Sequence, residues 1–493
     1  MIKLKKLLTQ DGRADMTNFE MDLFDTRMNS YTLEKVVKSF NFIKHVYICT
    51  DESEQCCQHS IIKPACVPIS VISLFIFLIV FLPLFSEDNF DNTSMRYVRS
   101  GCCTDQCRVQ FVESIPSVLA FNSSIRNLET YDVWKSLLDE TRTSIDIASL
   151  YWNLRDPEAL PASREVGNDT FARFLVAAKR GVRVSFLFSF INLFIVNMSK
   201  LFGTNGILHT KFWIADSRHV YIGSANMDWK SLTMVKEFGV IIWNCTCIAN
   251  DLYKIFNVYW RLGVDGAIVP HKWPLNLRTY FNFSHPLKLS NVGDTGVFIS
   301  SSPPEFNAKG REEDGNAIVA VMGDAENFVH ISVMDYMPVT LYMTNNTYWP
   351  KLDDAIRSTA YRGVKIRLLV GYWKYSKPEM ISFLKSLLEI NSGIPSRANH
   401  SGKIEVKMFA FPTNSSPEEF SYTYVNHCKY MVTEKIAYIG TSNWVGDYFL
   451  NTAGVGVSFI SPSFAKSLNE VFMRDWNSVY AKNVRDFLLT KHS

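Results

Sequence analysis

The chain has 493 residues, of which 47% are hydrophobic and 14% aromatic. This length exceeds one ordinary domain and allows a large core, so two domains or one duplicated domain are expected. The formal net charge of +3 is too small for a global field to attract a polyanion, so any binding of nucleic acid has to come from a local site.

The first predicted element is an apolar run within residues 64–86, PACVPISVISLFIFLIVFLPLF, which contains no charged residue. As a helix it would span roughly 30 Å, enough to cross a bilayer. A buried core helix is the alternative, but such helices rarely run this far without a charge. Lysines precede the run and acidic residues follow it, so the positive-inside rule predicts a type II signal anchor with residues 1–63 as a cytosolic tail.

The remainder of the chain would then lie in the lumen or outside the cell, where disulfides form. All nine Asn-x-Ser/Thr sequons follow the apolar run, in agreement with this orientation. The glycosylation candidates are Asn92, Asn122, Asn168, Asn197, Asn244, Asn282, Asn345, Asn399 and Asn414.

Six cysteines also follow the apolar run. The spacings CTDQC and CTC could suggest a zinc site, but no histidine lies near either in the sequence and the compartment favours disulfides. We therefore expect Cys103 and Cys107 to bridge to Cys245 and Cys247 and to tie the segment after the membrane to the body.

The rest of the chain repeats one order of elements. A strand at 144–152 is followed by a helix that runs into a strand at 169–184, and the same order recurs at 327–338 and 349–373. The segments KRGVRV and YRGVKI match, with a glycine closing each helix. Strand, helix, strand order favours α/β halves with largely parallel sheets.

These patterns divide the part of the chain after the apolar run into four regions. The segment before the second half is rich in Pro, Gly, Asn and Ser, which predicts a linker. The regions are 87–130, lumenal stalk and first strand; 131–262, half one; 263–315, linker; and 316–485, half two.

Each half carries the same polar set. Residues 206–226, GILHTKFWIADSRHVYIGSAN, and 425–443, VNHCKYMVTEKIAYIGTSN, both hold His-x-Lys, an acidic residue five positions after the lysine, and Gly-Ser/Thr-x-Asn. The first copy predicts two strands joined by a turn at Ser217 and Arg218. A lone His-x-Lys is a common chance match, but a repeat with the same spacing is not.

Two imidazoles, two ammonium groups and two amides that converge between the halves would form a site for a phosphodiester. The lysines and asparagines would bind the nonbridging oxygens. One imidazole can attack phosphorus to give a phosphohistidine, while the other protonates the leaving oxygen and then activates water. The scheme needs no metal or other cofactor. The residues are His209, Lys211, Asn226, His427, Lys429 and Asn443.

These segments resemble the signature of the phospholipase D superfamily, His-x-Lys-x4-Asp followed by Gly-Ser-x-Asn. Asp216 matches the motif acid, whereas Glu434 replaces it in the second copy. That replacement, with VESIP, KEFGV, NCTC and RDWNSVYA, resembles the type II membrane branch of the endolysosome that includes the mammalian members three and four.

The resemblance covers about residues 103–482. It implies an α/β fold of two pseudo-symmetric halves, each a mixed sheet flanked by helices, that share one active site. It further implies a lysosomal 5′ exonuclease on single-stranded DNA and RNA without a metal cofactor, and a homodimer. The body is expected in the lumen of the endoplasmic reticulum, Golgi and lysosome, with a released form as a further expectation.

The resemblance also suggests how the histidines divide the work. Glu237 lies 28 residues after His209, where the family places a carboxylate that hydrogen-bonds the histidine. The equivalent place in the second copy, Gly454 or Val455, has no carboxylate. A histidine held in one tautomer is the better-prepared nucleophile, so His209 is expected as the nucleophile and His427 as the general acid. Asp216 and Glu434 are expected to be structural ion-pair partners.

Two other functions remain open at this point. Transphosphatidylation of lysosomal lipids would use the same phosphohistidine. The third hypothesis is a noncatalytic membrane glycoprotein. The segment before His209 is shorter than the corresponding segment of half two, which leaves this hypothesis possible. An exonuclease would need stacking aromatics, although each candidate also suits ordinary core packing; they are Tyr151, Trp152, Tyr336, Trp229 and Trp444.

Overall fold

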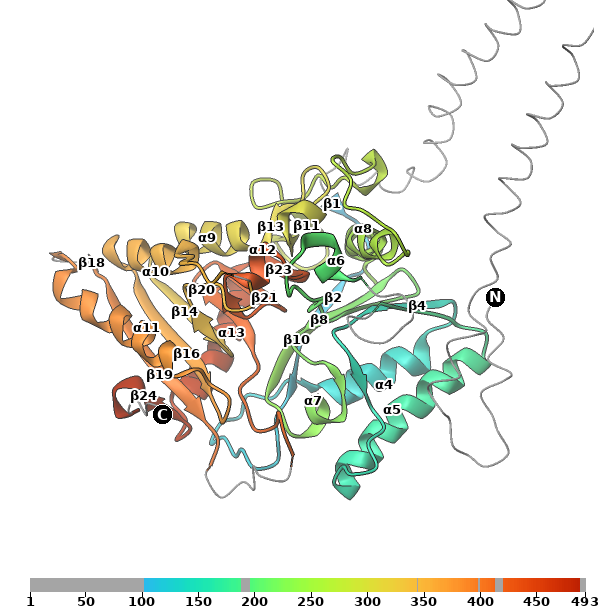
Figure 1. The fold of residues 1–493 in the computed structure, drawn as a ribbon, viewed down its shortest axis with the longest axis horizontal. Helices are drawn as coiled ribbons and strands as arrows, with labels where there is room; N and C mark the ends of the chain where they lie inside the picture. The colour runs from blue at the N-terminus through green and yellow to red at the C-terminus, as the bar shows by residue number, and fades with distance from the viewer. Residues whose placement is uncertain (1–101, 188–195, 344, 398–399, 413–419, 488–493) are drawn as a thin grey trace, which may run out of the picture. The chain divides into compact units, whose positions relative to one another are not determined.

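The computed structural model describes residues 102–187, 196–343, 345–397, 400–412 and 420–487 (Figure 1). The predicted tail, the predicted membrane segment 64–86 and the sequons at Asn92, Asn399 and Asn414 lie outside these residues. Within the described ranges, no helix combines the length and apolar character needed to cross a membrane.

The first half forms a seven-stranded sheet in the order β3-β2-β10-β8-β7-β4-β6. The strands are β2 Arg108–Ser114, β3 Leu128–Glu129, β4 Ser144–Ala148, β6 Arg183–Leu187, β7 Phe212–Ala215, β8 His219–Gly223 and β10 Glu237–Trp243. Only the pairs β2–β3 and β4–β6 are parallel. The prediction of largely parallel sheets is therefore wrong, because β7, β8, β10 and β2 follow one another in antiparallel pairs.

The second half repeats this arrangement within an eleven-stranded sheet. Its order is β1-β11-β12-β23-β21-β20-β14-β16-β19-β24, with β13 beside β12, and the run from β12 to β16 corresponds to the run from β2 to β6. The strands are β1 Cys102–Cys103, β11 Leu287–Leu289, β12 Thr295–Ser302, β13 Glu312–Glu313, β14 Phe328–Val333, β16 Lys365–Tyr372, β19 Lys403–Ala410, β20 Lys429–Thr433, β21 Ile436–Gly440, β23 Gly454–Ile460 and β24 Ala481–Asn483.

The predicted linker 263–315 is not a simple connection. It contains β11 and β12, and β12 pairs with β23 just as β2 pairs with β10. The sequence did not predict β12 because the serines of this strand and the prolines after it give the segment the composition of a loop. Half two therefore begins inside the predicted linker.

Helices cover the outer face of each sheet (Figure 1). On sheet one these are α4 Thr130–Glu140 and α5 Pro161–Lys179; on sheet two, α9 Asp314–Asp324, α10 Lys351–Tyr361 and α11 Pro378–Glu389. A central core draws side chains from both sheets and from α8 Thr246–Leu262 and α13 Pro462–Trp476. Alternation along β7 explains this layering, because Phe212 and Ile214 enter the central core while Trp213 enters the outer one.

Short elements complete the fold. They are β5 Trp152–Asn153, α6 Met198–Phe202, β9 Met227–Asp228, α7 Trp229–Thr233, η3 Leu275–Leu277, η4 Pro304–Phe306, β15 Tyr336–Met337, η5 Ile390–Gly393, β17 Ser396–Arg397, β18 His400–Ser401, β22 Trp444–Val445, α12 Asp447–Leu450 and η6 Val484–Asp486. Between β6 and β7 the described part of half one holds only α6, whereas half two has α11 and β19 at the corresponding place. Residues 188–195 of this segment lie outside the described residues.

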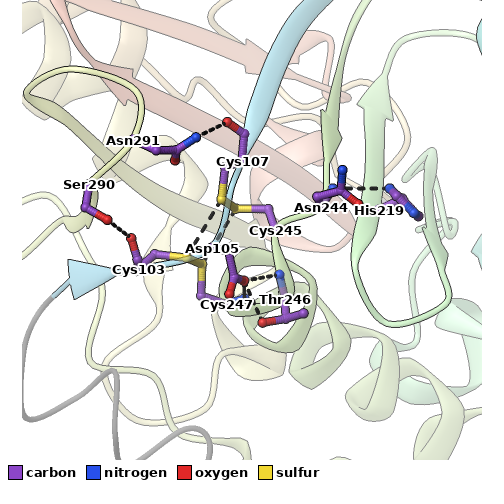
Figure 2. The surroundings of a disulfide bond; sticks show 10 residues. All are labelled: Cys103, Asp105, Cys107, His219, Asn244, Cys245, Thr246, Cys247, Ser290 and Asn291. Atoms are coloured by element: carbon purple, nitrogen blue, oxygen red, sulfur yellow. Dashed lines mark hydrogen bonds between the residues drawn. A yellow bond between two sulfur atoms is a disulfide. The ribbon is translucent and has the colours of Figure 1, made fainter.

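Two disulfides join the start of the described chain to α8 (Figure 2). Cys103 bonds to Cys247 and Cys107 to Cys245, as the sequence predicted for these four cysteines. The four sulfurs lie within 4.8 Å of one another, but each is used in an S–S bond, which removes the thiolates that zinc would need.

Candidate active site

A cleft with a volume of about 660 Å³ lies where the two halves meet. Five residues of the predicted site line it: His209, Asn226, Glu237, His427 and Asn443. Lys211 and Lys429 are buried beneath the histidines, and their ammonium groups donate to the carbonyl oxygens of His209 and His427 at 2.5 and 2.6 Å. The structure therefore brings together the pairs that the sequence separates by more than 200 residues.

Each His-x-Lys segment pairs with the residue that directly precedes a strand of the opposite half. These strands are β10 in half one and β23 in half two. The amide of His427 donates to the carbonyl of Lys236, and the amide of His209 to that of Ala453. Parallel bridges pair Asn426 with Lys236 and Leu208 with Ala453. This cross-pairing places Glu237 beside His427 and Gly454 beside His209.

The carboxylate of Glu237 consequently contacts the histidine of the other half. Its Oε2 lies 2.8 Å from Nδ1 of His427, and the hydroxyls of Ser224 and Ser231 also donate to it. The expectation that Glu237 holds His209 is wrong. Spacing along the chain gives the position of the carboxylate, but the backbone pairing between the halves decides which ring it meets.

The electrostatics of this pair fix the tautomer of His427. Burial alone would raise the pKa of Glu237, but His427, Lys429 and the Ser224 hydroxyl hold it below its ordinary value. An ionised carboxylate can only accept, so Nδ1 of His427 carries the proton and Nε2 keeps its lone pair. Burial also lowers the pKa of His427 to about 4, against the opposing effect of Glu237.

His209 has no comparable partner. Its Nδ1 is buried without a hydrogen bond, and its ring packs edge-on against Tyr448 at 4.8 Å between centroids. Burial, followed by Lys211 and Lys429, lowers the pKa of His209 well below its ordinary value. A Cβ at Gly454 would lie 2.2 Å from the Ser442 hydroxyl, so packing excludes an acidic side chain at the position equivalent to Glu237.

The lysines and asparagines add further polar groups to the site. Burial lowers the pKa of Lys429 to about 8, so it stays largely charged at neutral and acidic pH. The side-chain oxygens of Asn226 and Asn443 are buried without partners, and the amide nitrogen of Asn443 donates to Asp335 at 3.1 Å. The Lys429 ammonium suits an oxyanion, whereas the two unpartnered amide oxygens are acceptors and suit a hydroxyl or another donor of a ligand.

The two motif acids lie away from the cleft and are structural, but not as ion-pair partners. Asp216 accepts from the backbone amides of Arg142, Thr143 and Ser144, which lead into β4. Glu434 accepts from the amides of residues 326–328, which lead into β14. The longer Glu434 thus performs the same task as Asp216, in agreement with a structural role.

Two carboxyl groups of the cleft were missed by sequence reasoning. Asp228 accepts from the Tyr151 hydroxyl at 2.8 Å, and Asp335 accepts from Asn443. Burial raises the pKa of each to about 6. Both could have been found from the sequence, because each is an acidic residue that follows an apolar segment. Asp228 lies in SANMDW and Asp335 in ISVMDY.

The predicted stacking aromatics divide into two groups. Tyr151 lines the cleft, but Trp229, Tyr336 and Trp444 are buried and Trp152 packs against the outer core of half one. Ordinary packing therefore explains four of the five. Sequence reasoning missed the aromatic residues that do line the cleft, among them Trp373, Tyr375 and Tyr422.

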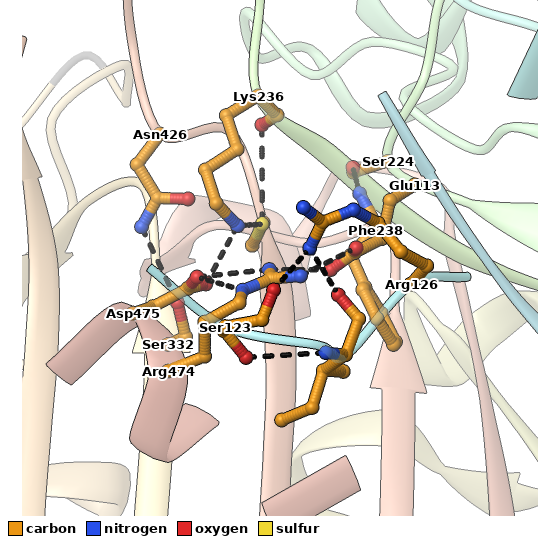
Figure 3. Close-up of polar contacts among 12 residues, drawn as sticks. Glu113, Ser123, Arg126, Ser224, Lys236, Phe238, Ser332, Asn426, Arg474 and Asp475 are labelled. Atoms are coloured by element: carbon orange, nitrogen blue, oxygen red, sulfur yellow. Dashed lines mark hydrogen bonds and ion pairs between the residues drawn. The ribbon is translucent and has the colours of Figure 1, made fainter. Parts of the chain in front are cut away.

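A buried ion cluster surrounds Lys236 (Figure 3), whose carbonyl accepts from the amide of His427. Lys236 pairs with Asp475 at 2.7 Å with both side chains fully buried, and Arg474 of the same helix pairs with Glu113 at 2.7 Å. Lys236 and Glu113 belong to half one, whereas α13 belongs to half two. The thiol of Cys428 lies 3.5 Å from the Lys236 ammonium, and burial raises its pKa to about 12, so it remains a thiol.

Comparison with known proteins gives one consistent picture. A family described as "PLD3/4, PLD-like domain" matches residues 122–414. A Caenorhabditis elegans protein named probable phospholipase D is 46% identical, covering 97% of this chain and 89% of the relative. Proteins named 5′-3′ exonuclease PLD3 are 40% identical in Xenopus tropicalis, covering 82% of this chain and 86% of the relative, and 39% in Homo sapiens, covering 78% and 82%.

Among solved structures, phosphatidylserine synthase from Haemophilus influenzae is similar in fold. The TM-score is 0.50 at 12% identity, covering 80% of this chain and 94% of the synthase. At that identity the likeness concerns the fold alone.

Proposed function

Because the chain belongs to the phospholipase D superfamily, in the branch of PLD3 and PLD4, and is a phosphodiesterase of that family, we propose that it removes nucleotides from the 5′ end of single-stranded DNA and RNA. The proposal is supported by the names of the relatives and by a cleft that combines two histidines, two lysines and two asparagines.

The observation that carries the mechanism is the contact between Glu237 and His427. With its proton fixed at Nδ1, His427 attacks the phosphorus through Nε2, and His209 in its protonated form gives its proton to the leaving oxygen. The substrate's negative charge next to His209 raises the pKa of that ring, which favours the protonated form when a phosphodiester is bound. We therefore reverse the roles expected from the sequence, with His427 as the nucleophile.

The second step returns the enzyme to its first state. His209, now neutral, takes a proton from a water molecule, whose oxygen attacks the phosphorus as the bond to His427 breaks. Lys211, Lys429 and the two asparagine amides stabilise the charge on the nonbridging oxygens in both steps. Because these groups supply the positive charge, we expect activity in the presence of EDTA.

The test is an exonuclease assay on the full chain in detergent, with a 5′-hydroxyl, 3′-labelled single-stranded oligonucleotide at pH 5 in EDTA. Stepwise shortening from the 5′ end by the wild type, with a loss of at least about 10³-fold in His427→Ala, is the expected result. Equal cleavage by wild type and His427→Ala, or no cleavage by folded wild type, would sink the proposal.

Transphosphatidylation of lipids is the alternative, and the name of the Caenorhabditis elegans relative points to it. Apolar residues such as Met337 and Leu341 also line the cleft and could contact an acyl chain. Product formed from a phospholipid and an alcohol acceptor, without cleavage of the oligonucleotide, would select this function. A noncatalytic glycoprotein would show neither activity.

We also propose a type II membrane protein with its body in the lumen of the secretory pathway and lysosome, glycosylated and dimeric. Exposed side chains at five of the predicted sequons support glycosylation: Asn122, Asn168, Asn197, Asn244 and Asn345. The two disulfides suit the same compartment. Digestion with an endoglycosidase should lower the apparent mass of the protein from secretory membranes, whereas an unchanged mass would argue against this location.

A further inference from the structure

We propose that Trp373, Tyr375 and Tyr422 form a stacking surface for a nucleobase of the strand bound beside the catalytic histidines, an inference that rests on the proposed nuclease function. All three residues line the same cleft as His209 and His427. Trp373 and Tyr375 directly follow β16, and Tyr422 lies five residues before His427. The aromatic group thus comes from two separate segments of half two that border the cleft.

The rings already contact one another. Tyr375 and Tyr422 stack with centroids 4.9 Å apart and planes 19° from parallel, and Trp373 meets the edge of Tyr375 at 4.9 Å. The side chain of Tyr422 is 62% exposed and that of Tyr375 39%. Large aromatic rings that stay exposed at a cleft offer π-faces to a ligand, and every nucleobase has a matching face.

The backbone supports a role beyond packing. Tyr422 has φ of 62°, in the left-handed region that a bulky residue seldom adopts. Strain of this kind persists where neighbouring structure imposes it and is concentrated at functional sites.

The indole nitrogen of Trp373 is buried without a hydrogen-bond partner among the described residues, so a polar group of a ligand could accept from it.

Cations beside the rings suit a strand with charged linkages. The Lys374 ammonium lies 5.9 Å from the Tyr375 ring centroid, and Lys377 lines the cleft. A stacked base places its phosphates within reach of such groups, whereas an acyl chain would gain from apolar area alone.

Tyr422 has no aromatic counterpart at the matching position of half one. Counting back from the two aligned histidines, the position equivalent to Tyr422 in half one is Thr204, which has no ring. At this position the two halves therefore offer a bound strand different side chains.

The test compares intact strands with strands that carry one abasic position, scanned over the first three nucleotides. In wild type we expect one abasic position to raise KM about 5- to 100-fold. Tyr422→Asn, which removes the ring at a position where asparagine tolerates the left-handed backbone, should raise KM for the intact strand by a similar factor. The abasic position should then have little further effect, because ring and base act as a pair.

Tyr375→Ala should behave in the same way, Tyr422→Phe, which keeps the ring, should retain the effect of the abasic position, and Tyr361→Ala, an exposed tyrosine on α10, is the matched control. The inference is overturned if no abasic position raises KM in wild type, or if folded Tyr422→Asn and Tyr375→Ala stay within twofold of wild type. The abasic scan decides the matter even if the variants do not fold. A wild type that does not cleave the intact strand would instead contradict the proposed function itself.

Discussion

At the scale of single residues, the two histidines differ in what lies beside their Nδ1 atoms. His427 has the carboxylate of Glu237 at Nδ1, whereas Gly454 occupies the matching position beside His209. The repeated spacing identified both histidines and both lysines, and the resemblance to the family identified Glu237. The sequence could not assign Glu237 to its histidine, since that depends on backbone pairing between segments that are 190 residues apart.

Glu237→Gln tests this contact. Glutamine keeps the shape but can donate its amide to Nδ1 of His427, which favours the wrong tautomer, and it removes the charge that stabilises the ring during attack. We expect kcat to fall about 10²-fold or more with an unchanged melting temperature, measured by steady-state kinetics and calorimetry. A kcat within threefold of wild type would show that the contact does not orient the nucleophile.

We expect Asp228 and Asp335 to make the activity depend on pH. Each has a pKa raised to about 6, so both lose their negative charge as pH falls through 6, and repulsion of a phosphodiester in the cleft decreases. His427, with its pKa lowered to about 4, stays neutral until the pH falls below that value. The profile of kcat/KM should therefore rise from pH 7 to about pH 5 and decline near pH 4.

Asp335→Asn should raise kcat/KM at pH 7 relative to pH 5 and flatten the alkaline side of the profile. Asp265→Asn, at an exposed position, is the control. An alkaline limb unchanged in both Asp335→Asn and Asp228→Asn would assign the pH dependence to other groups.

At the scale of elements, the repeat predicted most of the strands and helices around the site. The helix-closing glycines, Gly181 and Gly363, do adopt positive φ. The hairpin of β7 and β8 also lies where apolar alternation placed it. The sequence did not predict two features. Helix α5 begins eight residues before the predicted helix, and β12 lies within residues of loop-like composition. Sheet pairing makes β12 a strand, and composition alone carries no information about pairing.

Asp216 provides a test at this scale. It satisfies three backbone amides at the start of β4, so Asp216→Ala should destabilise the fold by about 1–2 kcal/mol in urea denaturation at pH 7. Its pKa lies below the ordinary value, so its contribution is present above about pH 4 and is lost only as pH falls further. Turnover per folded molecule should not change. A large loss of kcat in folded protein would instead give Asp216 a role in the chemistry.

At the scale of the whole molecule, the halves are interlocked rather than merely adjacent. Each histidine segment pairs with a strand of the other half, and α13 carries the buried ion cluster into half one. The motifs KEFGV and RDWNSVYA acquire a physical explanation here, because they contribute Lys236 with Glu237 and Arg474 with Asp475. The sequence showed that these motifs matter but not that they meet.

Asp475→Ala should leave the buried Lys236 ammonium unpaired. We expect a loss of about 3–5 kcal/mol in the free energy of unfolding, measured by chemical denaturation. Replacing both partners, Lys236→Met with Asp475→Leu, should recover most of it, because the unpaired ammonium is then removed and Arg474 keeps its pair with Glu113. If the double variant were as unstable as Asp475→Ala, the pair of Lys236 and Asp475 would contribute more to the free energy of unfolding than the neutralisation of each other's charge.

The central claim is that His427, held by Glu237 from the other half, becomes the phosphohistidine. Its most direct test is peptide mapping by mass spectrometry after brief reaction with a phosphodiester that carries a p-nitrophenol leaving group. That leaving group needs no acid, so His209→Ala should form the adduct and hydrolyse it slowly. The account predicts the phosphoryl adduct on His427 in His209→Ala and none in His427→Ala. An adduct on His209 in the His427→Ala variant would contradict it and restore the assignment expected from the sequence.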